Sequence, residues 1–157
     1  MTLRAKDIMV NNFDTVYEEA PVEDAIKMIL NGQVRPSGHK TISLMVLDKF
    51  QRFVGIITMY DVLYHLRPSV LNYGINGEEL PWEGELNRCF KELQGKKVRQ
   101  VMSAHIVGAS PDEHIMVLLD RMIKNKYRRL PILENERPIG IVYLSEIYHH
   151  LFAGRWG

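Results

Sequence analysis

Thr58 and Asp61 are the pair of residues whose types and spacing could most directly do chemistry. They close the stretch 55–61, in which an apolar run ends at a threonine and an aspartate follows three residues later. A run of β-branched residues that gives way to helical spacing predicts a buried strand turning into a helix. A helix N-terminus has unpaired N–H groups and a partial positive charge. The pair therefore predicts a helix cap or a contact with an anionic or hydroxyl-rich ligand, and one carboxylate could serve both.

The same stretch returns in altered form at residues 140–146. Tyr143 stands where the first copy has Thr58, and its bulky side chain cannot cap a helix in the same way. Glu146 stands where the first copy has aspartate, and its side chain reaches further. We therefore expect the two copies to differ in their chemistry.

The elements around the first copy must position these side chains. Pro21 followed by acidic residues marks a helix start, and apolar residues at helical spacing continue the helix over 22–30. The runs 42–47 and 53–57 predict two strands joined by a hairpin turn, and 58–66 predicts the helix that follows. Thr58 is thus expected where the second hairpin strand meets its helix.

The same order of elements resumes in the second half of the chain. Ser110, Pro111 and Glu113 predict the start of a helix. Strands over 127–133 and 139–142 and a helix over 144–151 are predicted to follow it. Corresponding positions of the two copies lie a constant number of residues apart, except for an insertion around residues 35–39 in the first copy and one residue in a hairpin turn.

This register predicts two copies of one β-α-β-β-α repeat, over residues 4–66 and 98–152, joined by a linker over 67–97. Each repeat is too short to bury its own core well, so the two are expected to pack as one α/β (α+β) module. The second half of the linker predicts an amphipathic helix, because apolar residues recur there at helical spacing: Trp82, Leu86, Phe90 and Leu93. Its apolar face is expected either to cover exposed surface of the repeats or to dock a partner chain.

Composition narrows the classes of function. The chain has 157 residues, 46% hydrophobic and 25% charged, which is typical of a soluble globular protein. A net charge of +1 gives no bulk field to attract nucleic acid or an anionic membrane. Cys89 is the lone cysteine, the N-terminus lacks the apolar core of a signal peptide, and no apolar run is long enough to span a bilayer. We expect a cytoplasmic protein.

Neither a catalytic centre nor a metal site is predicted. His149 and His150 point about 100° apart on a helix, and no ordered set of carboxylates or cysteines accompanies them and His114. A glycine-serine elbow and an HExxH helix are both missing from the sequence. We therefore expect a protein that is not an enzyme and that requires no cofactor.

The repeated pattern resembles the cystathionine-β-synthase-type (CBS) domain, found as tandem pairs called Bateman modules. The resemblance covers residues 4–66 and 96–152. It is carried by the segments at Met9 and Met102, the strands at 15–16, 106–107 and 129–132, and the two motif copies. Residues 55–61 fit the family's nucleotide motif of glycine, two apolar residues, Thr or Ser, two residues and Asp. The resemblance implies a pseudo-twofold pair of repeats with adenosine-ligand sites in the clefts between them.

The family also implies roles for particular residues. Its motif aspartate binds the ribose hydroxyls, its Thr or Ser lies near the ribose or phosphate, and cationic residues from the opposite repeat's hairpin strand often meet the phosphates. Carried over here, the resemblance implies a main site at Thr58 and Asp61, phosphate ligands at Arg128 and Arg129, and a weaker second site at Tyr143 and Glu146. Alternation along a strand sends the two arginines to opposite faces, so only one is expected to enter the cleft.

Two functions are left open by the sequence. One is a regulatory module that senses AMP, ADP, ATP or S-adenosylmethionine and acts on a partner protein that the sequence does not identify. The other is a structural or protein-interaction module whose clefts hold no nucleotide, favoured by the two departures from the motif at Tyr143 and Glu146. The resemblance implies a homodimer in either case.

Overall fold

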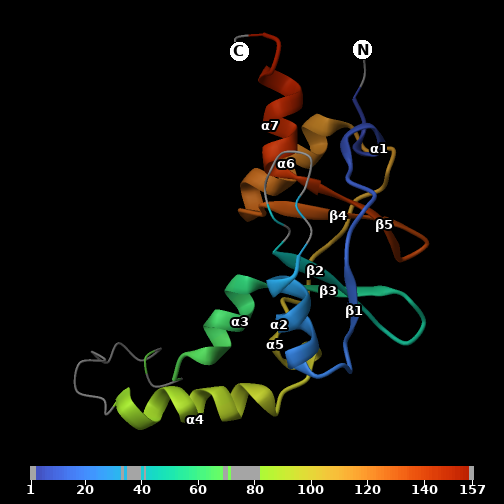
Figure 1. The fold of residues 1–157 in the computed structure, drawn as a ribbon. Coiled ribbons are helices and arrows are strands. Elements are labelled where there is room, and N and C mark those ends of the chain that lie inside the picture. Colours follow the sequence, from blue (N-terminus) through green and yellow to red (C-terminus); the bar gives the residue numbers. More distant parts are fainter. Residues whose placement is uncertain are drawn as a thin grey trace. The chain divides into compact units, whose positions relative to one another are not determined.

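The computed structural model describes residues 3–32, 34, 40, 42–68, 71 and 82–155. They form two compact units, whose elements are labelled in Figure 1. Unit 1 consists of residues 3–14, 50–53 and 105–155, and unit 2 consists of the described parts of Thr15–Lys49 and Val54–Ala104. The inserted stretch 35–39 and most of the first half of the linker lie outside the described residues.

Unit 2 is built on a three-stranded sheet in the order β1 (Thr15–Tyr17), β2 (Ser43–Leu47), β3 (Phe53–Thr58). β1 runs parallel to β2, with Val16 opposite Val46. Every residue of the central strand β2 is buried, as its nearly continuous apolar sequence predicts. β3 ends at Thr58, so the sheet positions the candidate site residue at the edge where the chain turns into a helix.

Four helices complete unit 2: α2 (Val22–Leu30), α3 (Met59–Leu66), α4 (Trp82–Gln94) and α5 (Val98–Val101). Together with the sheet they enclose one apolar core, which consists of Val16, Val22, Ala25, Ile29, Leu44, Val46, Ile57, Leu93, Val98 and Val101. α2 begins directly after Pro21, and α4 begins at the first residue of the predicted linker helix.

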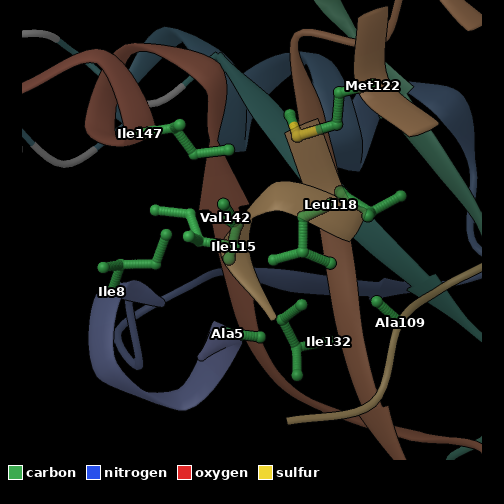
Figure 2. Close-up of a cluster of buried hydrophobic side chains, with 10 residues drawn as sticks. Ala5, Ile8, Ala109, Ile115, Leu118, Met122, Ile132, Val142 and Ile147 are labelled. Carbon is green, nitrogen blue, oxygen red and sulfur yellow. The ribbon is translucent and has the colours of Figure 1, made fainter. Parts of the chain in front are cut away.

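Unit 1 combines an antiparallel hairpin, β4 (Arg129–Glu134) and β5 (Arg137–Tyr143), with α1 (Ala5–Ile8), α6 (Ile115–Asn125) and α7 (Leu144–Phe152). Its core draws side chains from every one of these elements, and Figure 2 shows Ala5 and Ile8 among those of the hairpin and the two longer helices. Leu130 of β4 lies opposite Val142 of β5, and both are fully buried. This packing fixes the hairpin that carries the second motif copy.

The segment that leads into each repeat packs in the unit formed by the other repeat. Residues 3–14, with α1, belong to unit 1, whereas α5 and the residues up to 104 belong to unit 2. In unit 1, Val10 and Ile141 exchange backbone hydrogen bonds of 2.8 and 3.0 Å. In unit 2, Ser103 and Ile56 exchange bonds of 2.8 and 3.0 Å. We keep as a proposal the division of the chain into repeats over 4–66 and 98–152 and a linker over 67–97. The compact units differ from these repeats, because each unit contains the leading segment of the other repeat.

The predicted helix start at Ser110 and Pro111 is wrong. The carboxylate of Glu113 does accept from the Ser110 N–H at 2.7 Å, but residues 111–113 form a turn and α6 begins only at Ile115. The carbonyls of Pro111 and Glu113 accept from N–H groups of α1, both at 2.9 Å. Because these carbonyls bond to another element, they do not start the helix.

Candidate ligand-binding site

The N-terminus of α3 is closed by a capping box. Thr58 is the N-cap, with an extended backbone at φ −123° and ψ 168°, and its hydroxyl oxygen accepts from the Asp61 N–H at 3.2 Å. The Oδ2 atom of Asp61 accepts from the Thr58 N–H at 2.9 Å and from the Thr58 hydroxyl at 3.0 Å. Thr58 is buried and Asp61 is half-buried. The predicted cap is confirmed, and Asp61 keeps part of its surface exposed.

The other oxygen of this carboxylate is bonded to Ser103. The Ser103 hydroxyl donates to Oδ1 of Asp61 at 2.7 Å, and the serine itself is exposed. The backbone pairing of Ser103 with Ile56 of β3 holds the donor in place. Thr58, Asp61 and Ser103 thus form a polar cluster at the N-terminus of α3.

Ser103 is not among the site residues predicted from the sequence, because it lies outside the motif, far along the chain from Asp61. The sequence nevertheless contains one signal that points to Ser103. Ser103 follows Met102 and Val10 follows Met9, so the register of the two repeats places serine in one copy and valine in the other. A polar residue at one of two matching positions indicates that the copies differ there too.

Gly55, the first residue of the motif, makes room for this serine. A Cβ atom at position 55 would lie 2.7 Å from the Ser103 carbonyl oxygen and 2.9 Å from the Met102 sulfur. A glycine in a strand allows another backbone to approach closely. The glycine of the motif therefore allows the segment that carries Ser103 to pair with β3.

The second motif copy, in unit 1, lacks this polar arrangement. Tyr143 is the N-cap of α7, is buried at 7% exposure, and makes no side-chain hydrogen bond to the helix N-terminus. Glu146 lies in the first turn of α7 and is half-buried. Val10 pairs with Ile141 as Ser103 pairs with Ile56, but it brings no hydroxyl. The polar cluster of unit 2 therefore has no counterpart in unit 1, where Tyr143, Glu146 and Val10 stand in place of Thr58, Asp61 and Ser103.

The two predicted phosphate ligands lie beside the second motif copy in unit 1. Arg129 begins β4 and pairs with Tyr143 in register, and the Arg128 carbonyl accepts from the Leu144 N–H at 2.9 Å. Arg128 is exposed and Arg129 is half-buried. Thr58 and Asp61 belong to unit 2, so the assignment of these arginines to the same ligand stays a prediction.

The charge of Asp61 acts on one other titratable group of α3, the His65 imidazole. Burial lowers the pKa of His65 in the last turn of α3 below its ordinary value, the positive charge of Lys96 lowers it further, and Asp61 partly opposes both. His65 is therefore neutral near pH 7. The Asp61 carboxylate lies at the positive end of α3, where a negative charge is stabilised.

An apolar groove of about 630 Å³ lies between α3 and α4 in unit 2. Its lining includes Tyr60, Leu63 and Tyr64 from α3, and Trp82 and Leu86 from α4. The C-terminal part of α4 buries Cys89 and Leu93, whereas Trp82, Leu86 and Phe90 keep between 43% and 52% of their surface exposed. The linker helix thus covers apolar surface of unit 2 with one part of its stripe and leaves the other part accessible.

Neither a metal site nor a membrane-spanning helix is present in the described part of the chain. There, no group of three or more His, Cys, Asp or Glu side chains could hold a metal ion. The rings of His149 and His150 lie 6.0 Å apart, and both residues are exposed. Among the helices of the same residues, none has the length and apolar character needed to cross a membrane.

Paired α/β repeats, each with a glycine motif at a strand-to-helix turn, define a class of small two-repeat modules. The family model of the CBS domain matches residues 5–68 and 98–153. The chain therefore belongs to the CBS domain family, and the resemblance inferred from the sequence is confirmed.

The chain is also similar to individual proteins. The chain is 29% identical over 158 residues to the uncharacterized protein MJ1426 of Methanocaldococcus jannaschii, covering 93% of this chain and 89% of that protein. The CBS domain of a CBS-domain-containing membrane protein from Sphaerobacter thermophilus is 23% identical, with a TM-score of 0.70 and coverage of 94% of this chain and 86% of that one.

Two further similar structures were solved with ligands. CBSX2 of Arabidopsis thaliana, in complex with AMP, is 20% identical, with a TM-score of 0.69 over 97% of this chain and 98% of that one. The CBS domain pair of MJ0100, in complex with 5′-methylthioadenosine and S-adenosyl-L-methionine, is 18% identical, with a TM-score of 0.66 over 96% and 97% of the two chains. These likenesses confirm the predicted mixed α and β fold.

Proposed function

We propose that this chain is a regulatory module that binds an adenosine ligand of the series AMP, ADP, ATP and S-adenosylmethionine, with Thr58 and Asp61 at its ribose. Membership of the CBS domain family supports the proposal, as do the two structural relatives solved with adenosine compounds. The observation that carries it is the Asp61 carboxylate, held at the N-terminus of α3 beside an exposed hydroxyl.

The hydrogen bonds of Asp61 leave acceptor capacity for a ribose hydroxyl. A carboxylate offers about four lone-pair positions. Thr58 fills two positions on Oδ2, and Ser103 fills one on Oδ1. A further hydroxyl donor therefore has a position on Oδ1, and a bond to an ionised acceptor is stronger than one between neutral groups. The ribose is the part of an adenosine ligand that supplies such donors.

The phosphates of such a ligand need positive partners. We assign this role to the pair of the exposed Arg128 and the half-buried Arg129, of which one is expected to enter the cleft, because a guanidinium group matches phosphate with two parallel hydrogen bonds. The second motif copy, with Tyr143 and Glu146, is assigned weak binding or none. One ligand per chain is therefore expected.

Regulation requires that the ligand bind one arrangement of the protein more tightly than another, because equal affinity shifts no equilibrium. We assign the chain a signalling role as a homodimer that acts on a separate protein, with no catalytic reaction and no required cofactor. Cys89 is a buried free thiol, which suits a reducing compartment such as the cytoplasm.

Calorimetric titration tests this function. Adenosine, AMP, ADP, ATP and S-adenosylmethionine are titrated into the native protein, Asp61→Asn and the matched control Glu146→Gln. We expect at least one ligand to bind the native protein at one per chain, Asp61→Asn to weaken it by about tenfold or more, and Glu146→Gln to leave it unchanged. Absence of binding at millimolar ligand, or equal affinity of Asp61→Asn and the native protein, would refute the proposal.

The second candidate is a structural or interaction module with empty clefts. The apolar groove between α3 and α4 favours it, because exposed apolar surface of this kind marks interaction sites. A thermal-shift screen beside a light-scattering mass separates the two candidates. Stabilisation by one adenosine ligand supports the sensor, whereas a stable dimer that no nucleotide stabilises supports the interaction module.

A further inference from the structure

We propose that Ser103 is a positioning residue of the ligand site, which orients the Asp61 carboxylate to receive the ribose. This role rests on the proposed function. It is suggested by the hydrogen bond of 2.7 Å from the Ser103 hydroxyl to Oδ1 of Asp61. That oxygen is the one with an acceptor position left for a ligand.

The bonds of Thr58 alone do not fix the direction of Oδ1. They hold Oδ2, and the terminal torsion of an aspartate is broad. A donor on the second oxygen sets the plane of the carboxylate. The Ser103 bond is short, as expected for a hydroxyl that donates to an ionised acceptor.

The donor itself is held by the fold. The N–H and carbonyl of Ser103 both bond to Ile56 of β3, at 2.8 and 3.0 Å, and Gly55 leaves the space for this approach. The strand that precedes Thr58 therefore also positions Ser103. A site whose first contacts are held by such supporting bonds loses little freedom when a ligand binds.

The second copy supplies a natural comparison. Val10 makes the same pair of backbone bonds with Ile141 that Ser103 makes with Ile56. The fold thus accepts valine at the matching position of unit 1, so valine is a suitable replacement at position 103. Ser103→Thr and Ser103→Val give side chains of nearly equal shape that differ by one hydroxyl.

The experiment is a titration of AMP and 2′,3′-dideoxy-AMP against the native protein, Ser103→Thr, Ser103→Val, Asp61→Asn and the double variant Ser103→Val with Asp61→Asn. We expect Ser103→Val to weaken AMP by about tenfold and Ser103→Thr to stay within about threefold of the native protein. The dideoxy ligand should bind all forms with similar affinity. Ser103→Val should add little to Asp61→Asn, because the serine acts through the aspartate.

Three other outcomes would contradict the role of Ser103 or the proposed function. If the native protein binds AMP, and Asp61→Asn weakens it while Ser103→Val does not, the role of Ser103 is overturned and the proposed function stands. Equal losses of AMP and the dideoxy ligand in Ser103→Val would indicate a merely structural residue and overturn the role as well. If the native protein binds no adenosine ligand, the proposed function fails, and the role assigned to Ser103 fails with it.

Discussion

Gly55 lies against the backbone of Ser103, so closely that a Cβ atom on Gly55 would be 2.7 Å from the Ser103 carbonyl oxygen. The first residue of the motif and the residue that supports Asp61 are therefore linked by packing as well as by hydrogen bonds. The backbone of Ser103 can move away only by giving up its pairing with Ile56.

Gly55→Ala should destabilise the protein by about 1–3 kcal/mol, because the new methyl group meets backbone atoms of a paired segment. Gly140→Ala should cost less, since the three atoms nearest to its methyl group belong to the side chain of Met9 and not to a backbone. Gly84→Ala in α4 is the control: apart from its chain neighbours and the backbone of its own helix, no atom of the described residues lies within 4 Å of the new methyl group, and the change should stabilise the helix by up to about 1 kcal/mol. Urea unfolding of the three variants measures this order, and a Gly55→Ala protein as stable as the native one would contradict it.

Thr58→Ala should lower the free energy of unfolding by about 1 kcal/mol, because the N–H of Asp61 loses its acceptor at the N-terminus of α3. Thr58→Ser keeps the hydroxyl and should stay within a few tenths of a kcal/mol of the native value. Denaturant titration of both variants provides the measurement. Equal losses in the two variants would mean that packing of the threonine methyl group, and not the cap, is what stabilises the turn.

The stability of the protein should depend on pH through His65. Burial and the charge of Lys96 lower its pKa below the ordinary value of 6.5, so the unfolded chain takes up the proton first as the pH falls. The contribution of the neutral imidazole is fully present above pH 6.5 and is lost as the pH falls from there through the lower pKa of the folded protein. His65→Gln should lose less unfolding free energy between pH 7.5 and 5.5 than the native protein does. An equal loss in both would show that His65 does not contribute.

Replacing Arg128 and Arg129 together by alanine should weaken ATP more than adenosine, because only ATP carries the phosphates that these arginines are proposed to meet. The matched control replaces Lys124 and Lys126, two exposed cations of the same positive stretch, by alanine. Calorimetric titration of both double variants with both ligands measures the effect. Equal losses for ATP and adenosine in the arginine variant would refute the assignment.

The sequence predicts most of the fold because its local patterns are strong. The helix over 22–30, the two hairpins, the cap at Thr58 and the linker helix from Trp82 follow from spacing and turn residues, and the structure confirms them within a few residues. These features depend on contacts between neighbours in the chain. The repetition of these elements in the same order then identifies the family.

The features that the sequence did not predict depend on contacts between distant segments. The helices α1 and α5 have four residues each, too few for a periodic pattern, and they are held by pairing with the other repeat. α6 begins later than predicted for the same reason, because the carbonyls of Pro111 and Glu113 accept hydrogen bonds from N–H groups of α1. Ser103 lies beside Asp61 only because the segment that leads into the second repeat packs in unit 2. The preferred adenosine ligand cannot be predicted from the sequence, because it depends on the shape of the site and not on the order of its residues.

The exchange of leading segments also constrains how the chain can fold during its synthesis. α1 emerges early, but the residues that bury Ala5 and Ile8 belong to α6, α7 and the last hairpin. The core of unit 2 likewise includes Val98 and Val101, which follow the linker and are synthesised late. We therefore expect neither core to be complete on the ribosome before the second repeat begins to appear, and a nascent first repeat to expose apolar surface until then.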